Sequence, residues 1–426
     1  MPGTIVIADD VTGANDIGIM YAKAGLDAYV YSYEEEGSTE YPPCDALIID
    51  TDSRFDTHEN AYHKVFHALE RLPKENVTQY IDKQCSVFRG NIGAEFDAML
   101  DALGEEFAVV VLGFPNNGRT TLHSLHYVNG TLLENSQFRN DPVHPMRKSD
   151  LVEILQEQTK RKVGAIHYEV YDRGEEAVRQ ALEDARGRYS YVIMDVRDNR
   201  DLELLARVLR EEKVLCGSSA LSEYLARLEA GRRQKQKPHA FRVVQDKVFC
   251  MAGSLTPQTI GQTAYMKEKG YPVITVDTTR VFDGQEKKAE EERVLTEIEK
   301  AYRTSDFVMI HSMNRPEEVE QTKRMAAKKG IDNTEVSSMV SGLLSVISQK
   351  AIMRLKIRRI IVCGGDTSAS LCAHLGVRGM KVLEEIEAGL PTCESVEEPH
   401  YRMVLKSGSF GTPEFVYKAM EKLRLE

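Results

Sequence analysis

The sequence predicts an α/β protein of two domains, each with a mostly parallel sheet flanked by helices. Its 426 residues exceed what one hydrophobic core normally holds. Short apolar runs alternate with helical patterns along most of the chain, as in parallel sheets. The basic stretch 231–238 lacks apolar periodicity and is typical of a linker. We expect an N-terminal domain at 1–230, a linker at 231–243 and a C-terminal domain at 244–426, with the active site in the cleft between the domains.

The first strand, at residues 4–7, leads into an acidic turn. Asp9 and Asp10 follow the strand, and a helix is predicted over 16–24. In open α/β sheets, ligands collect outside the carboxyl ends of the strands. Asp9 and Asp10 therefore lie where a polar substrate would bind.

Basic residues follow the next strands. Arg54 comes just after a predicted strand and could clamp an anion, and a surface ion pair with Asp52 is the equally weighted alternative. The segment 83–89 follows another strand and adds Lys83 and Arg89. The strands are predicted at 28–31, 46–50, 79–83 and 109–112, and the helices at 57–72 and 93–103.

The polar segment 127–147 interrupts the alternation. Long irregular segments inside a compact domain are usually lids or binding loops. His144, between two prolines, is expected to hold structure rather than to act as a ligand. Helices at 151–160, 174–183 and 201–210, a strand at 191–195 and a helix ending near Leu228 resume the pattern.

Three turns in the second half suit a phosphate. The first turn follows the strand at 247–252, and the second follows the strand at 359–363. The third turn, at 406–411, precedes the last helix. Glycines let the backbone approach a ligand, and free N–H groups at a helix start attract anions. Further strands are predicted at 273–276 and 307–310, with helices at 287–302, 316–329 and 336–353.

Composition narrows the function classes. A net charge of -11 argues against nucleic acid as the main partner. No signal peptide precedes the first strand and no stretch approaches the apolar length of a membrane span, so a cytoplasmic protein without a membrane partner is expected. The cysteines form no C-x-x-C pair, which indicates reduced, mostly buried thiols. No Walker sequence or protein-kinase motif set occurs, which excludes the common nucleotide-binding folds that such motifs identify. No G-x-G-x-x-G fingerprint opens either domain, which argues against an oxidoreductase.

An acidic strand end combined with phosphate-compatible turns indicates phosphoryl transfer to a small hydroxylated acid. Seven motifs follow one another in order: Ile7–Asp16, Asp50–Arg54, Phe88–Glu95, Asn117–Thr121, Ala252–Ser254, Cys363–Ser368 and Leu405–Gly411. In this order they closely resemble the four-carbon acid sugar kinases, over nearly the whole chain.

The resemblance implies that the N-terminal domain binds a four-carbon sugar acid and that the C-terminal domain binds ATP with Mg²⁺. By position, the acid would be bound by Asp9, Arg54, Lys83, Gln84, Cys85, Ser86 and Arg89, and ATP by Ser254, Gly364, Gly365, Asp366, Thr367, Ser407 and Gly408. Asp10 and Asp366 are rival candidates for the general base. The metal ligands stay unassigned, and a homo-oligomer is a loose expectation from the family.

One position departs from the family pattern. Most members have aspartate, in a Lys-x-Asp-Ser-Thr-Leu-Arg-Gly stretch, where this chain has Cys85. The Gly-Ala-Asn-Asp form of the first motif favours D-threonate or D-erythronate as the substrate. A kinase for 3-oxo-tetronate or another small hydroxy acid is the alternative, and a non-catalytic sensor of sugar acid and nucleotide is a hypothesis from another class.

Overall fold

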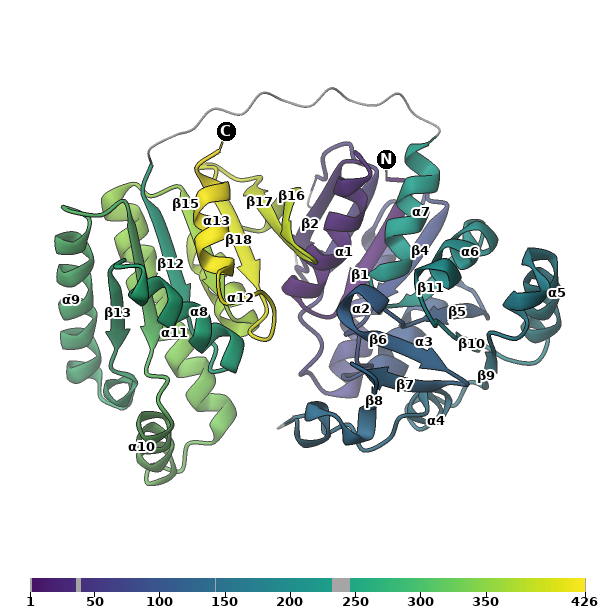
Figure 1. Ribbon diagram of the computed structural model, residues 1–426, viewed down its shortest axis with the longest axis horizontal. Coiled ribbons are helices and arrows are strands. Elements are labelled where there is room, and N and C mark those ends of the chain that lie inside the picture. The colour runs from purple at the N-terminus through teal and green to yellow at the C-terminus, as the bar shows by residue number, and fades with distance from the viewer. Residues whose placement is uncertain (1, 36–39, 142, 232–245, 426) are drawn as a thin grey trace. The chain divides into compact units, whose positions relative to one another are not determined.

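The computed structural model describes residues 2–35, 40–141, 143–231 and 246–425. The chain divides into two compact units, Met1–Gln236 and Lys237–Glu426 (Figure 1). The predicted linker at 231–243 lies, apart from Gly231, outside the described residues. Each unit is an α/β domain of mostly parallel strands flanked by helices, which confirms the predicted fold class.

The N-terminal domain is built on a parallel sheet in the order β2-β3-β1-β4-β11-β5-β10-β9. Its central strands are buried on both faces and therefore form continuous apolar runs. In register, Ala8 lies opposite both Asp50 and Lys83, so β1, β3 and β4 end level with one another. The strands are β1 (Thr4–Ala8), β2 (Ala28–Ser32), β3 (Ala46–Asp50), β4 (Gln79–Lys83), β5 (Ala108–Val111), β9 (Val163–Ile166), β10 (Tyr191–Met194) and β11 (Val214–Gly217).

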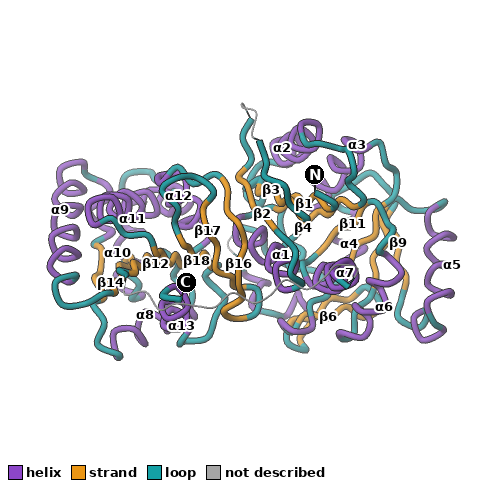
Figure 2. Tube along the Cα trace, turned by 90° about the horizontal axis from the view of Figure 1, so that it is seen from above, coloured by secondary structure: helices purple, strands orange, loops and turns teal. Residues whose placement is uncertain are grey.

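Helices cover both faces of this sheet. Figure 2 shows α2 and α3 on one face and α1, α6 and α7 on the other. The helices are α1 (Val11–Lys23), α2 (His58–Arg71), α3 (Ile92–Leu103), α4 (Leu151–Gln156), α5 (Glu175–Arg186), α6 (Asn199–Leu209) and α7 (Ala220–Ala230), with short 3-10 turns η1 (Pro115–Asn117) and η4 (Tyr171–Arg173).

The first helix begins earlier than predicted. Asp10 is its N-cap, and the Asp10 Oδ1 atom accepts a hydrogen bond from the Gly13 backbone N–H at 2.7 Å. Aspartate is a strong capping residue, so the helix starts at Val11 and not at Asp16. The prediction of a long turn after Asp9 was wrong, and the first turn of α1 itself faces the strand ends.

The segment predicted to be irregular, 127–147, is only partly so. Part of it belongs to a three-stranded antiparallel sheet of β6 (Arg119–Leu122), β7 (Leu125–Val128) and β8 (Thr131–Leu132), followed by η2 (Leu133–Asn135) and η3 (Gln137–Asn140). The β6–β7 turn is formed by His123 and Ser124, which have φ values of 48° and 64°. The alternating polar residues of these short strands hid them from the apolar pattern.

The sheet of the C-terminal domain has the order β13-β14-β12-β15-β18-β17-β16. The first five strands pair in parallel, and β17 runs antiparallel to β16 and β18. In this sheet, the strands β16, β17 and β18 were not predicted from the sequence. The strands are β12 (Val248–Ala252), β13 (Val273–Val276), β14 (Phe307–Ser312), β15 (Arg359–Cys363), β16 (Gly379–Glu387), β17 (Leu390–Ser395) and β18 (Arg402–Lys406).

This sheet is also covered on both faces. In Figure 2, α8 and α13 lie on one face, and α9, α11 and α12 lie on the other. The 3-10 turn is η5 (Thr278–Phe282), and the helices are α8 (Pro257–Glu268), α9 (Gly284–Ala301), α10 (Pro316–Ala327), α11 (Asn333–Leu355), α12 (Gly365–Leu375) and α13 (Phe415–Leu423).

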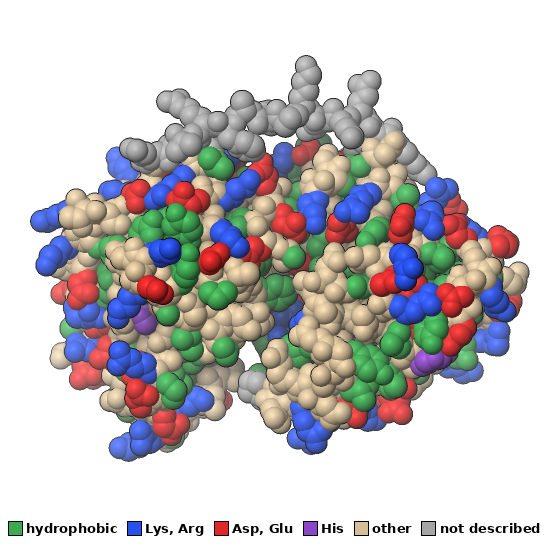
Figure 3. Space-filling view, in the orientation of Figure 1, with side chains coloured by type: hydrophobic (Ala, Val, Ile, Leu, Met, Phe, Trp, Pro, Cys, Tyr) green, Lys and Arg blue, Asp and Glu red, His purple; other side chains and the backbone are tan. Residues whose placement is uncertain are grey.

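Helix α11 is long and apolar enough, by length and composition, to cross a membrane, and it is the only such helix among the described residues. The expectation that no stretch has this length was therefore wrong. Half of the apolar window is buried inside the structure, where α11 packs against α9 and α12, and a buried core helix passes the same test. On the face shown in Figure 3, acidic and basic side chains are interspersed.

Candidate functional site

The level ends of β1, β3 and β4 bring Asp9, Asp10 and Arg54 together. The Arg54 guanidinium donates from Nε to Asp9 Oδ2 and from NH2 to Asp9 Oδ1, each at 2.7 Å, and from NH1 to Asp10 Oδ2 at 2.6 Å. Arg54 and Asp9 are buried. The alternative of a surface pair between Arg54 and Asp52 was therefore wrong, because the guanidinium is buried between two other carboxylates.

Asp10 has a structural role at the start of α1. It caps α1, and its Oδ2 atom accepts hydrogen bonds from Arg54 and from the Thr12 hydroxyl at 2.9 Å. Burial alone would raise the pKa of Asp10, but the charges of Arg54 and Lys83 outweigh burial and hold the pKa below its ordinary value. Asp10 is thus an ionised hydrogen-bond acceptor at neutral pH.

Lys83 lies beside the same helix start. Its Nζ atom donates to the Gln84 carbonyl at 3.1 Å and lies 3.7 Å from Asp16 Oδ2. A Cβ atom on Gly13 would lie 2.7 Å from Asp10 Oδ1 and 3.0 Å from Lys83 Nζ, so glycine is required for this close approach. Asp16, which also accepts a hydrogen bond from Ser219 Oγ at 2.5 Å, was missed as a site residue.

Gln84, predicted to contact the acid, takes part in a buried hydrogen-bond network. It is fully buried, and its Nε2 atom donates to Asp82 Oδ1 at 2.7 Å and to Glu95 Oε2 at 2.5 Å. Glu95 Oε1 accepts from Ser53 Oγ at 2.9 Å. Burial raises the pKa of Asp82 to about 8 and raises the pKa of Glu95 well above its ordinary value. Gln84 therefore belongs to a buried carboxyl network that supports the site.

Cys85 lies among arginines. Burial favours its neutral thiol, but the charges of Arg89 and Arg54 outweigh burial and lower the pKa of Cys85. Arg89 also pairs with Asp141, and the guanidinium groups of Arg89 and Arg119 each lie 5.9 Å from the centre of the Phe138 ring. Arg119, at the start of β6, and Asp141, which follows η3, were missed as site residues.

Two histidines hold the loops of this site in place. His126 donates from Nε2 to the Ser86 carbonyl at 2.9 Å, and its Nδ1 lies 3.0 Å from the Thr121 hydroxyl. Burial lowers the pKa of His126 to about 4, so its ring is neutral at pH 7. His144 Nε2 donates to the Arg54 carbonyl at 3.0 Å, and the ring stacks on Phe55. The structural role predicted for His144 fits these contacts.

The C-terminal domain brings its three predicted turns together. In register, Ala252 lies opposite Cys363, and Cys363 lies opposite Lys406, so β12, β15 and β18 end level. A Cβ atom on Gly408 would overlap Ser254 Oγ, and a Cβ atom on Gly364, whose φ is +135°, would lie 2.8 Å from Thr367 Oγ1. Four predicted nucleotide-site residues therefore meet at one sheet edge.

Lys406 anchors the third turn. It is fully buried, and its Nζ atom donates to Thr259 Oγ1 at 2.9 Å and to the carbonyls of Ser407 at 3.0 Å and Gly408 at 3.2 Å. Burial lowers the pKa of Lys406. No carboxylate of the described residues forms an ion pair with it, so the site has a buried cation suited to an anion. From the sequence, Lys406 was predicted only to begin a turn.

The start of α12 adds a second feature that attracts anions. Gly364 is the N-cap and has no side chain to satisfy the free N–H groups of the first turn. Gly365 begins the helix, and Asp366 is exposed in its first turn, with its Oδ2 atom 3.4 Å from Ser337 Oγ. An exposed carboxylate beside an anion site is suited to a hard cation such as Mg²⁺.

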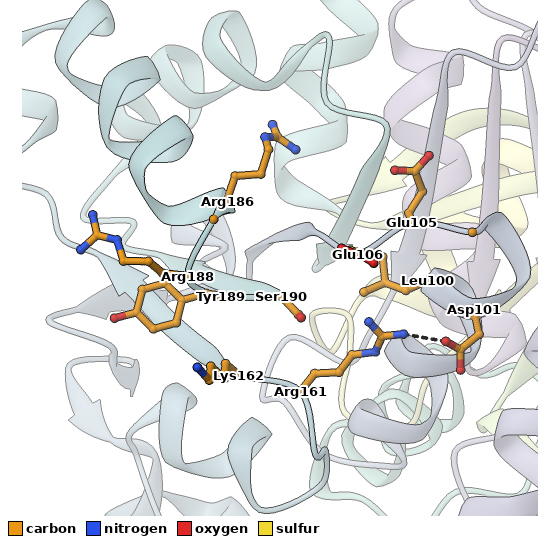
Figure 4. Close-up of a pocket in the computed structure, with 12 residues that line it drawn as sticks. Leu100, Asp101, Glu105, Glu106, Arg161, Lys162, Arg186, Arg188, Tyr189 and Ser190 are labelled. Atoms are coloured by element: carbon orange, nitrogen blue, oxygen red, sulfur yellow. Dashed lines mark hydrogen bonds and ion pairs between the residues drawn. The ribbon is translucent and has the colours of Figure 1, made fainter.

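A separate pocket of about 590 Å³ lies elsewhere in the N-terminal domain (Figure 4). Its lining residues precede β5, β9 and β10, so the pocket lies at the amino ends of the strands. Its Arg161 pairs with Asp101 at 2.6 Å, and its Arg186 pairs with Glu212 at 2.8 Å. The pocket is therefore at the opposite sheet edge from Asp9 and Arg54.

Two family models match the chain, one in each domain. A sugar-binding N-terminal domain matches residues 4–225, and a nucleotide-binding C-terminal domain matches residues 249–416. A 3-oxo-tetronate kinase of Haemophilus influenzae is 29% identical, over 96% of this chain and 97% of the relative. Another from Pseudomonas savastanoi pv. phaseolicola is 30% identical, over 98% of this chain and 96% of the relative.

Solved structures with the same fold cover nearly the whole chain. A protein of Salmonella typhimurium LT2, provisionally described as a tRNA synthase, superposes with a TM-score of 0.85 and 28% identity, over 98% of this chain and 99% of that chain. Haemophilus influenzae protein HI1011 gives a TM-score of 0.76 and 28% identity over the same shares.

Proposed function

The chain belongs to the four-carbon acid sugar kinase family, and from that membership we propose that it phosphorylates a hydroxyl group of 3-oxo-tetronate. The enzyme is an ATP-dependent phosphotransferase with an alcohol group as acceptor. The relatives named 3-oxo-tetronate kinase favour the oxo acid over D-threonate or D-erythronate, which the first motif had favoured.

The observation that carries the proposal is the anion site of the C-terminal domain. Gly364 and Gly408 allow backbone N–H groups close to a ligand, Lys406 adds a buried cation, and α12 adds its free N–H groups. We assign the ATP phosphates to this site, with Ser254, Gly365, Thr367 and Ser407 as further contacts. Phosphoryl transfer depends mainly on positioning and charge stabilisation, which these groups supply.

The acid is assigned to the strand ends of the N-terminal domain. Arg54 already makes three hydrogen bonds to Asp9 and Asp10, so the acid carboxylate is better matched to Arg89 or Lys83. A guanidinium can hold a carboxylate with two parallel hydrogen bonds, which favours Arg89. Asp9 and Asp10 retain acceptor capacity and would orient substrate hydroxyls.

Asp366 offers oxygen donors for Mg²⁺ at the nucleotide site. When bound, the ion would neutralise phosphate charge. Asp10 and Asp366 remain the two candidates for the base that takes the hydroxyl proton. The lowered pKa of Asp10 makes it a weak base, while Asp366 is exposed and has fewer hydrogen bonds.

Product identification tests the proposal. Purified protein is incubated with ATP, Mg²⁺ and one acid at a time, and the products are read by mass spectrometry and ³¹P NMR. A phosphate monoester of a four-carbon acid supports the proposal. Nucleotide binding without any phosphorylated acid would instead favour the sensor.

A further inference from the structure

We propose that His123, His167 and Asp195, with Glu169, form a binding site for a divalent transition-metal ion such as Zn²⁺. The ligand atoms of the first three residues all lie within 4.8 Å of one another. Glu169 Oε1 lies 3.1 Å from His123 Nε2 and can supply a fourth ligand. Within the ranges that the structure describes, no other group of three such residues converges in this way.

The donor set and spacing suit zinc. Two imidazole nitrogens and two carboxylate oxygens are typical zinc ligands, and a tetrahedral site at 2.0–2.2 Å per bond spaces its ligand atoms by about 3.4 Å. Two distances are close to this spacing: 3.1 Å between His123 Nε2 and Glu169 Oε1, and 3.3 Å between His167 Nδ1 and Asp195 Oδ2. Two carboxylates would also balance the charge of a divalent ion.

The backbone fixes three of the four positions. His167 directly follows β9 and Asp195 directly follows β10, and these strands end level because Ile166 pairs with Met194. The buried Asp195 carboxylate accepts the backbone N–H groups of His123 and Ser124, each at 2.9 Å. It therefore holds the β6–β7 turn, and with it His123, beside His167.

One donor atom in the cluster lacks a hydrogen bond. His167 Nδ1 is buried, and although it lies 3.3 Å from Asp195 Oδ2, it makes no hydrogen bond of acceptable geometry. A buried ring nitrogen without a partner is costly, and a metal ion would satisfy it. The nearby Arg197 cation pairs with Asp172 and Asp201, each at 2.8 Å, so its charge is already compensated.

The cluster is separate from the acid and nucleotide sites. It shares no residue with the acid site, and β10 is three strand spacings, or about 14 Å, from β4. The same β6–β7 hairpin carries His126, which donates to Ser86. A metal ion here would stabilise that hairpin and does not replace Mg²⁺.

Metal titration of the full-length protein tests the inference without any substrate. Chelator-treated protein is titrated with Zn²⁺ in competition with a chromophoric chelator, and with Co²⁺ for visible absorption. We expect one equivalent bound in the wild type, a tetrahedral Co²⁺ spectrum, and at least a tenfold loss of affinity in His123→Ala and His167→Ala.

His63→Ala is the matched control. His63 and His67 lie one helical turn apart on α2, with ring centres 5.5 Å apart, and form the competing two-histidine site. The control should bind Zn²⁺ as the wild type does. Loss of binding in His63→Ala with retention in His167→Ala, or no bound metal in the wild type, would overturn the inference.

Discussion

Arg54 and Asp9 form a buried bidentate ion pair, with Nε and NH2 of the arginine each 2.7 Å from one carboxylate oxygen. The two residues come from loops after neighbouring strands, β3 and β1. Asp9 and Arg54 therefore hold each other in place before any substrate binds. This pair fixes the loops after β1 and β3 relative to each other.

Arg54→Met should destabilise the protein strongly. Removing one partner of a buried ion pair leaves an uncompensated charge, which costs about 3–5 kcal/mol of unfolding free energy. Urea denaturation measures the loss. Arg173→Met, at an exposed arginine of η4, should change stability by less than about 0.5 kcal/mol. Equal effects in the two variants would contradict the role given to Arg54.

Gly408→Ala should weaken ATP binding. The added methyl would overlap Ser254 Oγ and push apart two turns of the anion site. We expect at least a tenfold higher Kd for ATP by calorimetric titration. Gly342→Ala, in the interior of α11 where a Cβ meets nothing within 4 Å, should leave the Kd unchanged. Wild-type affinity in Gly408→Ala would place the nucleotide elsewhere.

Lys406→Met should weaken ATP binding. The Nζ atom of Lys406 donates to Thr259 Oγ1 and to the carbonyls of Ser407 and Gly408, so its loss leaves buried acceptors unpaired in the third turn and should also lower the Tm. Loss of the positive charge and of the ordered turn beside the phosphates predicts an ATP Kd raised at least tenfold. A lowered Tm with unchanged affinity would show a purely structural lysine.

Cys85 should be the first cysteine to react with iodoacetamide. It is partly exposed, whereas the other six cysteines are buried, and the charges of Arg89 and Arg54 lower the pKa of its thiol. The pH profile of alkylation should have its midpoint below 9, and Cys85→Ser should abolish the fast phase. Peptide mapping identifies the modified residue. First modification of Cys216, or of another buried thiol, would contradict the expectation.

The stability of the N-terminal domain should fall as pH rises. Burial raises the pKa of Asp82 from its unfolded value near 3.8 to about 8, so the protonated acid is favoured in the folded state. Its contribution is complete below the unfolded pKa and is lost as pH rises through about 8. Denaturation at pH 5 to 8.5 measures the slope, and Asp82→Asn should flatten it. An identical slope in the variant would refute the assignment.

The strand ends of both sites were visible in the sequence because buried parallel strands are continuous apolar runs with polar residues after them. The start of α1 was not, because Asp10 was assigned to chemistry and overlooked as a cap. Strand β16 was missed because four of its nine residues are charged. Gln84 donates hydrogen bonds to Asp82 in β4 and to Glu95 in α3. The sequence does not show that Glu95 lies beside Gln84, because the fold brings α3 to this position.

The proposed Zn²⁺ site could not be predicted from the sequence. His123, His167 and Asp195 are separated by up to 72 residues and follow three different strands. Only strand pairing and the turn held by Asp195 bring them together. Sequence spacing alone therefore gives no signal for this cluster.

The most direct test of phosphoryl transfer to a four-carbon acid is the rate of ADP formation by the purified protein with ATP and Mg²⁺, measured for 3-oxo-tetronate, D-threonate and D-erythronate. We expect acid-dependent turnover with the highest kcat/KM for 3-oxo-tetronate, and a large loss of turnover in Gly408→Ala but not in Gly342→Ala. No turnover with any four-carbon acid, while ATP still binds, would contradict this expectation.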